Sequence, residues 1–372
     1  KNILKHPNLF FKEQNMKKKS SSVKKITPKN LNLNNILKDK KILELYKDFE
    51  KNLENLNFTN KKVAIAVSGG IDSIALCFLI SCYKLKSNNQ IKPFFYLVNH
   101  GLRKDSTKEA YLVKKQLGSK KINVKILKWL GKKPKSNIQN LSRKKRYGLL
   151  FNECKKNKIN TILTAHHNDD IYETFFSRLL RGSGTEGLSS FTSIKKQFNF
   201  KGFEINVVRP LLNFSKKELT YVTHNSFKFY VHDSSNDMDK FQRVRLRRLI
   251  SDLKDQGLNF DKLKITLRNL TSTNKAINKL VDQNISKNVL FNKNKLLIKS
   301  DFFILPEEII FRSLSILLKK MSSNEYPPRG KKIINLINDL KFKDKFKATL
   351  GGTIIEKIHD SVVVTKEKTK KR

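Results

Sequence analysis

The sequence predicts an α/β fold, namely a doubly wound parallel sheet followed by a helical region and a small C-terminal α+β domain. Three observations support it. Short continuous apolar runs alternate with helix-period segments between residues 60 and 181, which is typical of parallel strands covered by helices on both faces. The helical period dominates from residue 237 onward. Strand-like segments around a Gly351–Gly352 turn then follow between Lys345 and Val364.

Four buried strands are expected in the sheet, each followed by a helix, and an amphipathic helix from Lys38 precedes the first of them. We predict strands at 63–67, 94–99, 124–129 and 161–165, and helices at 74–83, 106–117, 137–156 and 168–181. Ligands of such sheets bind beyond the carboxyl ends of the strands, so the loops that follow these strands should form the site.

The remaining segments suggest a hairpin and further helices. Residues 192–208 alternate like a hairpin, and Ser215 with Glu218 has the spacing of a capping box that opens a helix to about residue 224. Later helices are expected at 244–253, 261–285 and 308–320. We therefore divide the chain into a disordered basic arm (1–37), a nucleotide-binding catalytic domain (38–235), a helical domain (236–325) and a small α+β domain with a frayed basic tail (326–372).

The charge of the chain indicates a polyanionic partner. Among 372 residues, 78 Lys and Arg face 32 Asp and Glu, a formal net charge of +46. Abundant lysine can reflect compositional drift, but the arginines are unevenly placed, since ten of the 14 fall between Arg103 and Arg248. Arg binds phosphates with a planar fork that Lys cannot copy. A nucleic acid is the partner that this pattern favours.

The cysteine count and the hydropathy exclude two classes of protein. Cys77, Cys82 and Cys154 are too few for a disulfide framework and lack metal-site spacing, which suits a reducing cytoplasm. No apolar run approaches the roughly 18 residues that span a membrane. We expect neither a disulfide-stapled secreted scaffold nor a membrane protein, and the sequence points to no protein partner.

The sharpest motif is Ser68-Gly69-Gly70-Ile71-Asp72-Ser73, between the first predicted strand and its helix. The glycines let the backbone turn tightly, and the N–H groups at the helix start can face an anion. The serine hydroxyls can donate to phosphate oxygens, and Asp72 can hold Mg²⁺ or orient the phosphates. The motif lacks the Gly-Lys-Ser/Thr ending of a Walker A loop. It resembles the signature of the PP-loop ATP pyrophosphatase superfamily, whose members use ATP to adenylate an oxygen and release pyrophosphate.

A second constellation follows the fourth predicted strand. His166 and Asp170 are four residues apart, and Asp170 and Glu173 are three apart, so on one helix all three would share a face. Such a cluster could bind a metal, take a proton or hold an ammonium group. Its place at a strand end favours a role in the ligand cleft over a solvated helix start.

Several weaker motifs follow one another in a specific order. They are Asn99-His100-Gly101-Leu102-Arg103, the Gly-rich run from Leu179 to Leu188, Arg209-Pro210-Leu211-Leu212, Asp233-Ser234-Ser235-Asn236 and Phe241-Gln242-Arg243-Val244-Arg245-Leu246-Arg247. Together with the loop they resemble the tRNA(Ile)-lysidine synthetase family, closely over about residues 60–250 and loosely from Thr349. One departure is Val244 after Arg243, where the family usually has Asn.

The resemblance implies a specific reaction. The family adenylates the C2 oxygen of the wobble cytidine in a CAU-anticodon tRNA(Ile), and free L-lysine then displaces AMP to give lysidine. It implies ATP and Mg²⁺ as cofactors, with residues 68–73 holding ATP and Asp72 near the metal and pyrophosphate. Asp170 and Glu173 would recognise the lysine ammonium or a metal, and His166 would position the reacting groups. The helical domain would bind tRNA.

The arginines complete the expected site. The resemblance and the basic pattern together assign contacts with tRNA or developing phosphate charge to Arg103, Arg181, Arg209, Arg243, Arg245, Arg247 and Arg248.

Two other functions stay open on the sequence. One is another PP-loop tRNA-modifying enzyme, such as a thiolating enzyme, although Cys77 and Cys82 lie inside a predicted helix, where buried structural thiols are usual. The other is a non-catalytic basic RNA-binding protein, in which the loop residues should have eroded. The loop is intact, which favours the enzyme.

Overall fold

A computed structural model describes residues 36–55, 62–86, 91–103, 105–131, 138–189, 191, 194–231, 242–292, 295–322 and 327–367. The described chain forms two compact units, the first from Lys1–Glu173 and Ser193–Leu249, the second from Thr174–Thr192 and Ile250–Arg372. The expected frayed tail, most of the basic arm and the Asp233–Asn236 motif lie outside the described residues. Among the described helices, none is both long and apolar enough to cross a membrane.

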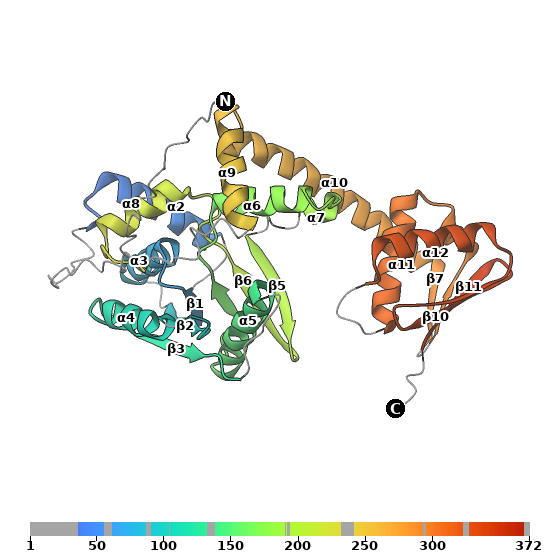
Figure 1. Ribbon diagram of the computed structural model, residues 1–372, viewed down its shortest axis with the longest axis horizontal. Helices are drawn as coiled ribbons and strands as arrows, with labels where there is room; N and C mark the ends of the chain where they lie inside the picture. The colour runs from blue at the N-terminus through green and yellow to red at the C-terminus, as the bar shows by residue number, and fades with distance from the viewer. Residues whose placement is uncertain are drawn as a thin grey trace, which may run out of the picture. The chain divides into compact units, whose positions relative to one another are not determined.

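A six-stranded sheet forms the centre of the first unit, in the order β3-β2-β1-β4-β6-β5 (Figure 1). Five of its strands are parallel, and only β5 runs antiparallel to its neighbour β6. The strands are β1 (Lys62–Val67), β2 (Lys92–Asn99), β3 (Val124–Lys128), β4 (Thr161–Leu163), β5 (Lys195–Phe200) and β6 (Phe203–Val208). The four expected strands are confirmed, and the expected hairpin extends the same sheet.

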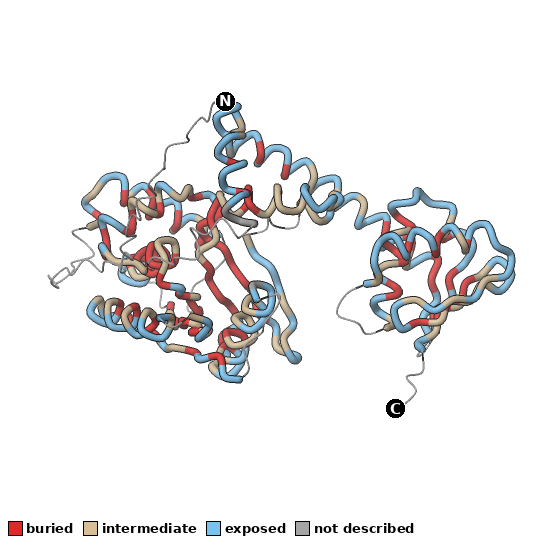
Figure 2. The backbone as a smooth tube through the Cα atoms, in the orientation of Figure 1, coloured by how far each residue is buried: buried red, intermediate tan, exposed pale blue. Residues whose placement is uncertain are grey.

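Helices cover both faces of this sheet, as the continuous apolar strands predict. Val63 and Ile65 of β1 pack in one core with side chains of α2, α3, α4 and α8, whereas Ala64 packs in a second core with α5. Successive residues of a strand point to opposite faces, so a strand buried on both sides must be apolar throughout (Figure 2). The helices of this unit are α2 (Lys40–Glu54), α3 (Ile71–Lys86), α4 (Ser106–Gly118), α5 (Ile138–Lys156) and α8 (Lys216–Asn225). The doubly wound fold is confirmed.

Two helices cross the boundary between the units, α6 (Asn168–Leu179) and α9 (Gln242–Asp255). The second unit also contains α7 (Thr185–Ser189), α10 (Phe260–Asn288), the 3-10 helix η2 (Ser300–Phe303), α11 (Glu307–Ser322) and α12 (Gly330–Phe342). Its antiparallel sheet has the order β7-β8-β11-β10-β9. The strands are β7 (Val289–Asn292), β8 (Lys295–Ile298), β9 (Phe346–Leu350), β10 (Thr353–Ile358) and β11 (Ser361–Lys366).

The second unit buries one core that draws on both sides of the boundary expected at residue 325. Ile298 and Leu314 pack in the same cluster as Ile337 and Val364. The strands β7 and β8 fall in the segment expected to be helical, and β8 pairs with β11. At the other end of the chain, Leu37, assigned to the basic arm, is buried in the first unit.

Candidate active site

The side chain of Ser73 bonds three backbone groups of the loop after β1. Its Oγ accepts from the backbone N–H groups of Ser68 (3.2 Å) and Gly69 (3.0 Å) and donates to the carbonyl of Gly70 (2.9 Å). Helix α3 begins at Ile71, directly after this turn. The N–H groups of its first turn have no helical carbonyl to bond, so they can receive an anion along the helix dipole.

Gly69 is required by the geometry of this turn. Its φ of +86° lies in the region that side chains with a Cβ rarely adopt, and an added Cβ would lie 2.6 Å from Cγ2 of Val113. Its carbonyl accepts from the N–H of Val231 at 2.9 Å. The turn is therefore packed from behind by α4 and by the segment after α8.

The acidic segment lies at the neighbouring strand end. β4 pairs directly with β1, with Leu163 opposite Ile65. The strand order reverses between these two strands, which is where doubly wound sheets bind their ligands. Asp170, on the first turn of α6, accepts from the backbone N–H of His167 at 3.0 Å and so caps the helix.

His166 differs from the expectation. It lies before α6 begins and does not share a helical face with Asp170 and Glu173; its Nδ1 is instead 2.8 Å from Oγ1 of Thr164. Thr164 Oγ1 also lies 3.3 Å from the carbonyl oxygen of Val208 at the end of β6. Burial, with the charge of Arg209, lowers the pKa of His166 to about 3 against the attraction of Asp170. This imidazole is neutral at physiological pH and a weak base.

Glu173 is already paired. Its Oε1 accepts from Nε of Arg247 on α9 at 2.5 Å, and its side chain is only 9% exposed. Burial acts to lower the pKa of Arg247, but the hydrogen bond to Glu173 and the charges of Glu173, Asp170 and Asp72 outweigh it and raise that pKa. Arg247 therefore stands among all three carboxylates of the site.

Lys216 and His167, neither of them among the expected site residues, lie within 3.5 Å of Asp72. Lys216, the first residue of α8, places its Nζ 2.6 Å from Asp72 Oδ1. The imidazole of His167 lies between two carboxylates, with Nε2 3.5 Å from Asp72 Oδ1 and Nδ1 3.7 Å from Asp170 Oδ2. The imidazole of His167 thus lies between the loop after β1 and the start of α6. No sequence pattern marks the Lys216 contact, since 144 residues separate the partners.

The other expected arginines differ in burial and in location. Arg209 is buried at the end of β6 and acts on His166 through its charge. Arg103 pairs with Glu109 at 2.9 Å. Arg245 and Arg248 are exposed on α9, Arg181 is exposed and belongs to the second unit, and the side chain of Arg243 lies outside the described residues.

The residues fit a nucleotide with Mg²⁺ better than a protein-held metal. Within the described ranges, no group of three or more His, Cys, Asp or Glu side chains could hold a metal ion. Mg²⁺ is usually bound by one or two carboxylates together with substrate phosphates. Asp72, one carboxylate beside an anion-binding turn, meets that requirement.

All three cysteines of the chain are buried and unpaired. Burial raises the pKa of Cys82 and of Cys154 to about 12, and it also raises the pKa of Cys77. A thiolate is the reactive form of cysteine, so none of the three is suited to carry sulfur.

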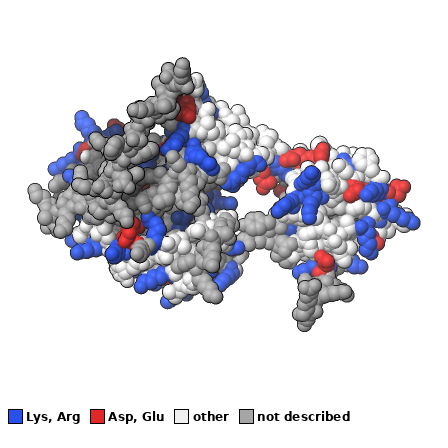
Figure 3. Space-filling model, in the orientation of Figure 1, with Lys and Arg blue, Asp and Glu red and all other residues white. Residues whose placement is uncertain are grey.

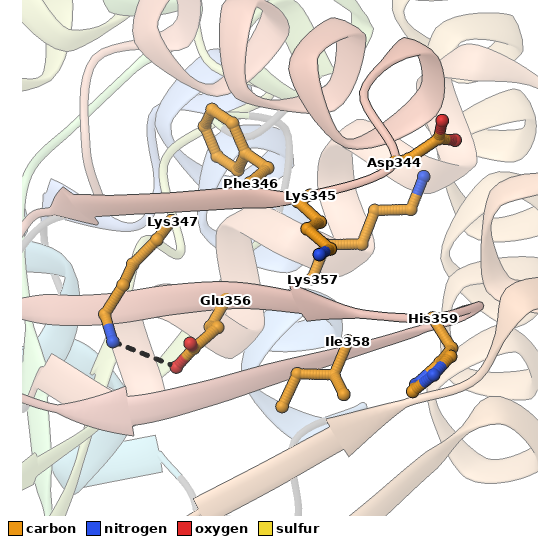
Figure 4. A pocket seen from close by; sticks show the side chains of 8 residues that line it. All are labelled: Asp344, Lys345, Phe346, Lys347, Glu356, Lys357, Ile358 and His359. Atoms are coloured by element: carbon orange, nitrogen blue, oxygen red, sulfur yellow. Dashed lines mark hydrogen bonds and ion pairs between the residues drawn. The ribbon is translucent and has the colours of Figure 1, made fainter.

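Surface features of the second unit lack this chemistry. A hollow of about 510 Å³ lies against β9 and β10, where Lys347 pairs with Glu356 at 3.2 Å (Figure 4). None of the expected site residues lines it. Figure 3 shows Lys and Arg side chains spread over the visible surface of both units, with fewer Asp and Glu.

Comparisons with known proteins agree with this geometry. The PP-loop domain family matches residues 39–253. A tRNA(Ile)-lysidine synthase from Wolbachia pipientis wMel is 35% identical over 339 residues, covering 88% of this chain and 76% of the relative. That of Rickettsia prowazekii (strain Madrid E) is 33% identical over 344 residues, covering 88% and 75%.

A solved structure shares the fold. The U34-tRNA thiolase NcsA from Methanococcus maripaludis superposes with a TM-score of 0.52 at 18% identity, over 63% of this chain and 78% of that one. With the sequence matches over most of both chains, the loop at the switch point and the acidic segment beside it, this chain belongs to the tRNA(Ile)-lysidine synthase family of PP-loop enzymes.

Proposed function

We propose that this chain joins free L-lysine to C2 of the wobble cytidine in a CAU-anticodon tRNA(Ile), converting ATP to AMP and pyrophosphate. One observation carries the proposal. The anion-binding turn and the acidic segment stand at adjacent strand ends, and the imidazole of His167 lies between Asp72 and Asp170. The names of the relatives support the same reaction.

The first step is adenylation of the tRNA. The C2 oxygen of the cytidine attacks the α-phosphorus of ATP, and the bond between that phosphorus and the bridging oxygen breaks, so that pyrophosphate leaves with the electron pair. The N–H groups of the first turn of α3, which begins at Ile71 directly after the turn that Ser73 fixes, would face the phosphates. Asp72 would hold Mg²⁺ with the phosphate oxygens, and the ion would neutralise charge on the departing group.

The second step is displacement by lysine. The ε-nitrogen attacks C2, the C2–O bond breaks, AMP leaves with that electron pair, and the nitrogen loses a proton. We assign the binding of the lysine ammonium to the carboxylate of Asp170. Glu173 would contribute by sharing its carboxylate between Arg247 and the ammonium. Neutral His166 is too weak a base to take the proton and would position the reactants.

The chemistry of the cysteines disfavours sulfur transfer as the alternative. A thiolating enzyme that carries sulfur on cysteine needs an accessible thiolate, and all three thiols are buried with raised pKa values. Three unpaired thiols also fit a reducing compartment, and we place the enzyme in the cytoplasm.

The test is mass spectrometry of the wobble nucleoside after the protein is incubated with ATP, Mg²⁺, L-lysine and an unmodified CAU-anticodon tRNA(Ile). We expect lysidine at the wobble position, with AMP and lysidine formed in equal amounts. A methionine tRNA with the same anticodon is the control and should stay unmodified. Product formation without lysine, or addition of sulfur, would refute the proposal.

A further inference from the structure

The ammonium group of Lys216 stands at the mouth of the nucleotide loop. Its Nζ lies 2.6 Å from Oδ1 of Asp72, and 44% of its side chain is exposed. We propose that Lys216 is a phosphate-binding residue that moves from Asp72 to the β- and γ-phosphates of ATP and stays with the pyrophosphate as it leaves. This inference rests on the proposed use of ATP and assigns one further residue to it.

The backbone of Lys216 is fixed with respect to the loop. Ser215 and Glu218 form a capping box that sets where α8 begins. One and a half turns on, Thr223 Oγ1 donates to the carbonyl of Ile71 at 2.9 Å, and Leu219 and Val222 are buried in the core shared with α3. Two separate attachments therefore hold α8 beside the start of α3, and only the flexible side chain of Lys216 can move.

Fold stability does not explain this lysine. Partly exposed ion pairs contribute little to the stability of a fold, and both partners are partly exposed, at 44% and 27%. A cation on the first turn of a helix is also unfavourable, because the helix dipole places positive charge there. What distinguishes Lys216 is that its ammonium lies beside Asp72 at an anion-binding turn, where it is positioned to bind a phosphate.

The charges of Asp72, of the ATP phosphates and of the leaving pyrophosphate explain the position of Lys216 instead. Asp72 would repel the phosphates that the turn attracts, and a neighbouring ammonium offsets that repulsion. During adenylation the bond between the α-phosphorus and the bridging oxygen breaks, and the electron pair goes to pyrophosphate. An ammonium group on a four-carbon stem can follow this charge with three donors, which stabilises the transition state.

The test compares Lys216→Met with Lys217→Met, since Lys217 is the adjacent, exposed lysine of the same helix. Calorimetry with the full chain measures the binding of Mg²⁺ with a non-hydrolysable ATP analogue and, separately, of AMP. We expect Lys216→Met to weaken binding of the analogue roughly 10- to 100-fold, as for a lost hydrogen bond to a charged group. Its AMP affinity and both affinities of Lys217→Met should change less than about twofold, because AMP lacks the β- and γ-phosphates. Equal losses for both nucleotides, or none, would overturn the assignment.

A double-mutant cycle separates direct contact from mere neutralisation of Asp72. In an Asp72→Asn background, Lys216→Met should still weaken analogue binding by a similar factor. If Lys216 acts only by neutralising Asp72, the second substitution has no effect and the inference fails. These measurements need neither tRNA nor lysine. Failure to form lysidine would therefore refute the proposed function while leaving the role of Lys216 supported. If lysidine forms but the binding measurements fail, only the role of Lys216 is refuted.

Discussion

The two units each hold an arginine among polar side chains, but they satisfy it in different ways. The Arg312 side chain of α11 is 6% exposed, whereas the Arg247 side chain of α9 is 51% exposed and has Glu173 as its carboxylate partner. The groups that accept from Arg312 come from α7, α10 and α11, namely Thr185, Asn274, Asn278 and Glu308.

This difference shows how one residue type serves two purposes. A buried guanidinium surrounded by acceptors of its own unit joins helices, because removing it leaves those acceptors unpaired. A half-exposed ammonium beside a partly exposed carboxylate, as in the pair of Lys216 and Asp72, contributes little to stability and can exchange that partner for a ligand. By this criterion the first unit keeps exchangeable charges at its strand ends, and the second unit uses its buried charge to hold α7 against α10 and α11.

The largest effect should come from the first unit. Asp72→Ala is expected to lower the rate of tRNA adenylation at least about 10³-fold, because the position beside the phosphates loses its carboxylate. Tm and tRNA affinity should change little, since Asp72 is partly exposed and contacts the nucleotide side of the site. Single-turnover AMP formation with labelled ATP measures the rate. Undiminished turnover would remove Asp72 from the mechanism.

Arg312→Met should show the opposite pattern. The substitution keeps an apolar stem but leaves the acceptors on α7 and α10 without their donor, so we expect a loss of about 2–3 kcal/mol in the free energy of unfolding of the second unit. Chemical denaturation, followed by hydrogen exchange resolved to α7, α10 and α11, measures it. Binding of an ATP analogue should stay as in the parent chain. A nucleotide-binding defect without destabilisation would contradict the comparison.

The sequence could predict the sheet but not these contacts. Continuous apolar runs such as Val63–Val67 signal a strand buried on both faces, so the parallel sheet and the place of the loop at a strand end followed from general rules, whereas the strand order came from the structure. The four-residue strands β7 and β8 have too few positions to show a period. Helix α12 was not among the predicted helices.

Within the site, sequence spacing located side chains but not their partners. The spacing correctly predicted that Asp170 and Glu173 share one helix. The expectation that His166 lies on the same helix was wrong. The pairs Asp72–Lys216 and Glu173–Arg247 join residues 144 and 74 positions apart. Such contacts depend on how α8 and α9 return to the strand ends, which a local pattern does not contain.

The neutral state of His166 predicts a pH dependence. Its folded pKa of about 3 lies below the ordinary value of 6.5, so protonation favours the unfolded chain. Its contribution is therefore complete above about pH 6.5 and is lost progressively as the pH falls towards 3, by at most about 1.4 kcal/mol per pH unit. Urea titrations of the parent chain and of His166→Gln between pH 7 and 4.5 measure it. The parent should lose stability more steeply, and parallel curves would refute the assignment.

The smallest effect should fall on the exposed arginines of α9. Arg245 and Arg248 lie three residues apart on the helix and are both exposed, which suits contacts with tRNA phosphates. Replacing both with Ala should weaken tRNA binding about tenfold and reduce the slope of log affinity against log salt by about 1–2. ATP-analogue binding should not change, because both side chains are exposed on α9.

A matched control removes the same net charge elsewhere. Lys47 and Lys51 are both exposed on α2, and replacing both with Ala should leave the salt slope within about 0.3 of the parent value if only contacted phosphates release counterions. Equal slopes for the two double variants would mean that general basicity, which the net charge of +46 already provides, accounts for binding. A slope reduced only for the arginine pair would make α9 a tRNA-contacting helix and would add a third class to the comparison, in which exposed cations on a helix surface serve the substrate.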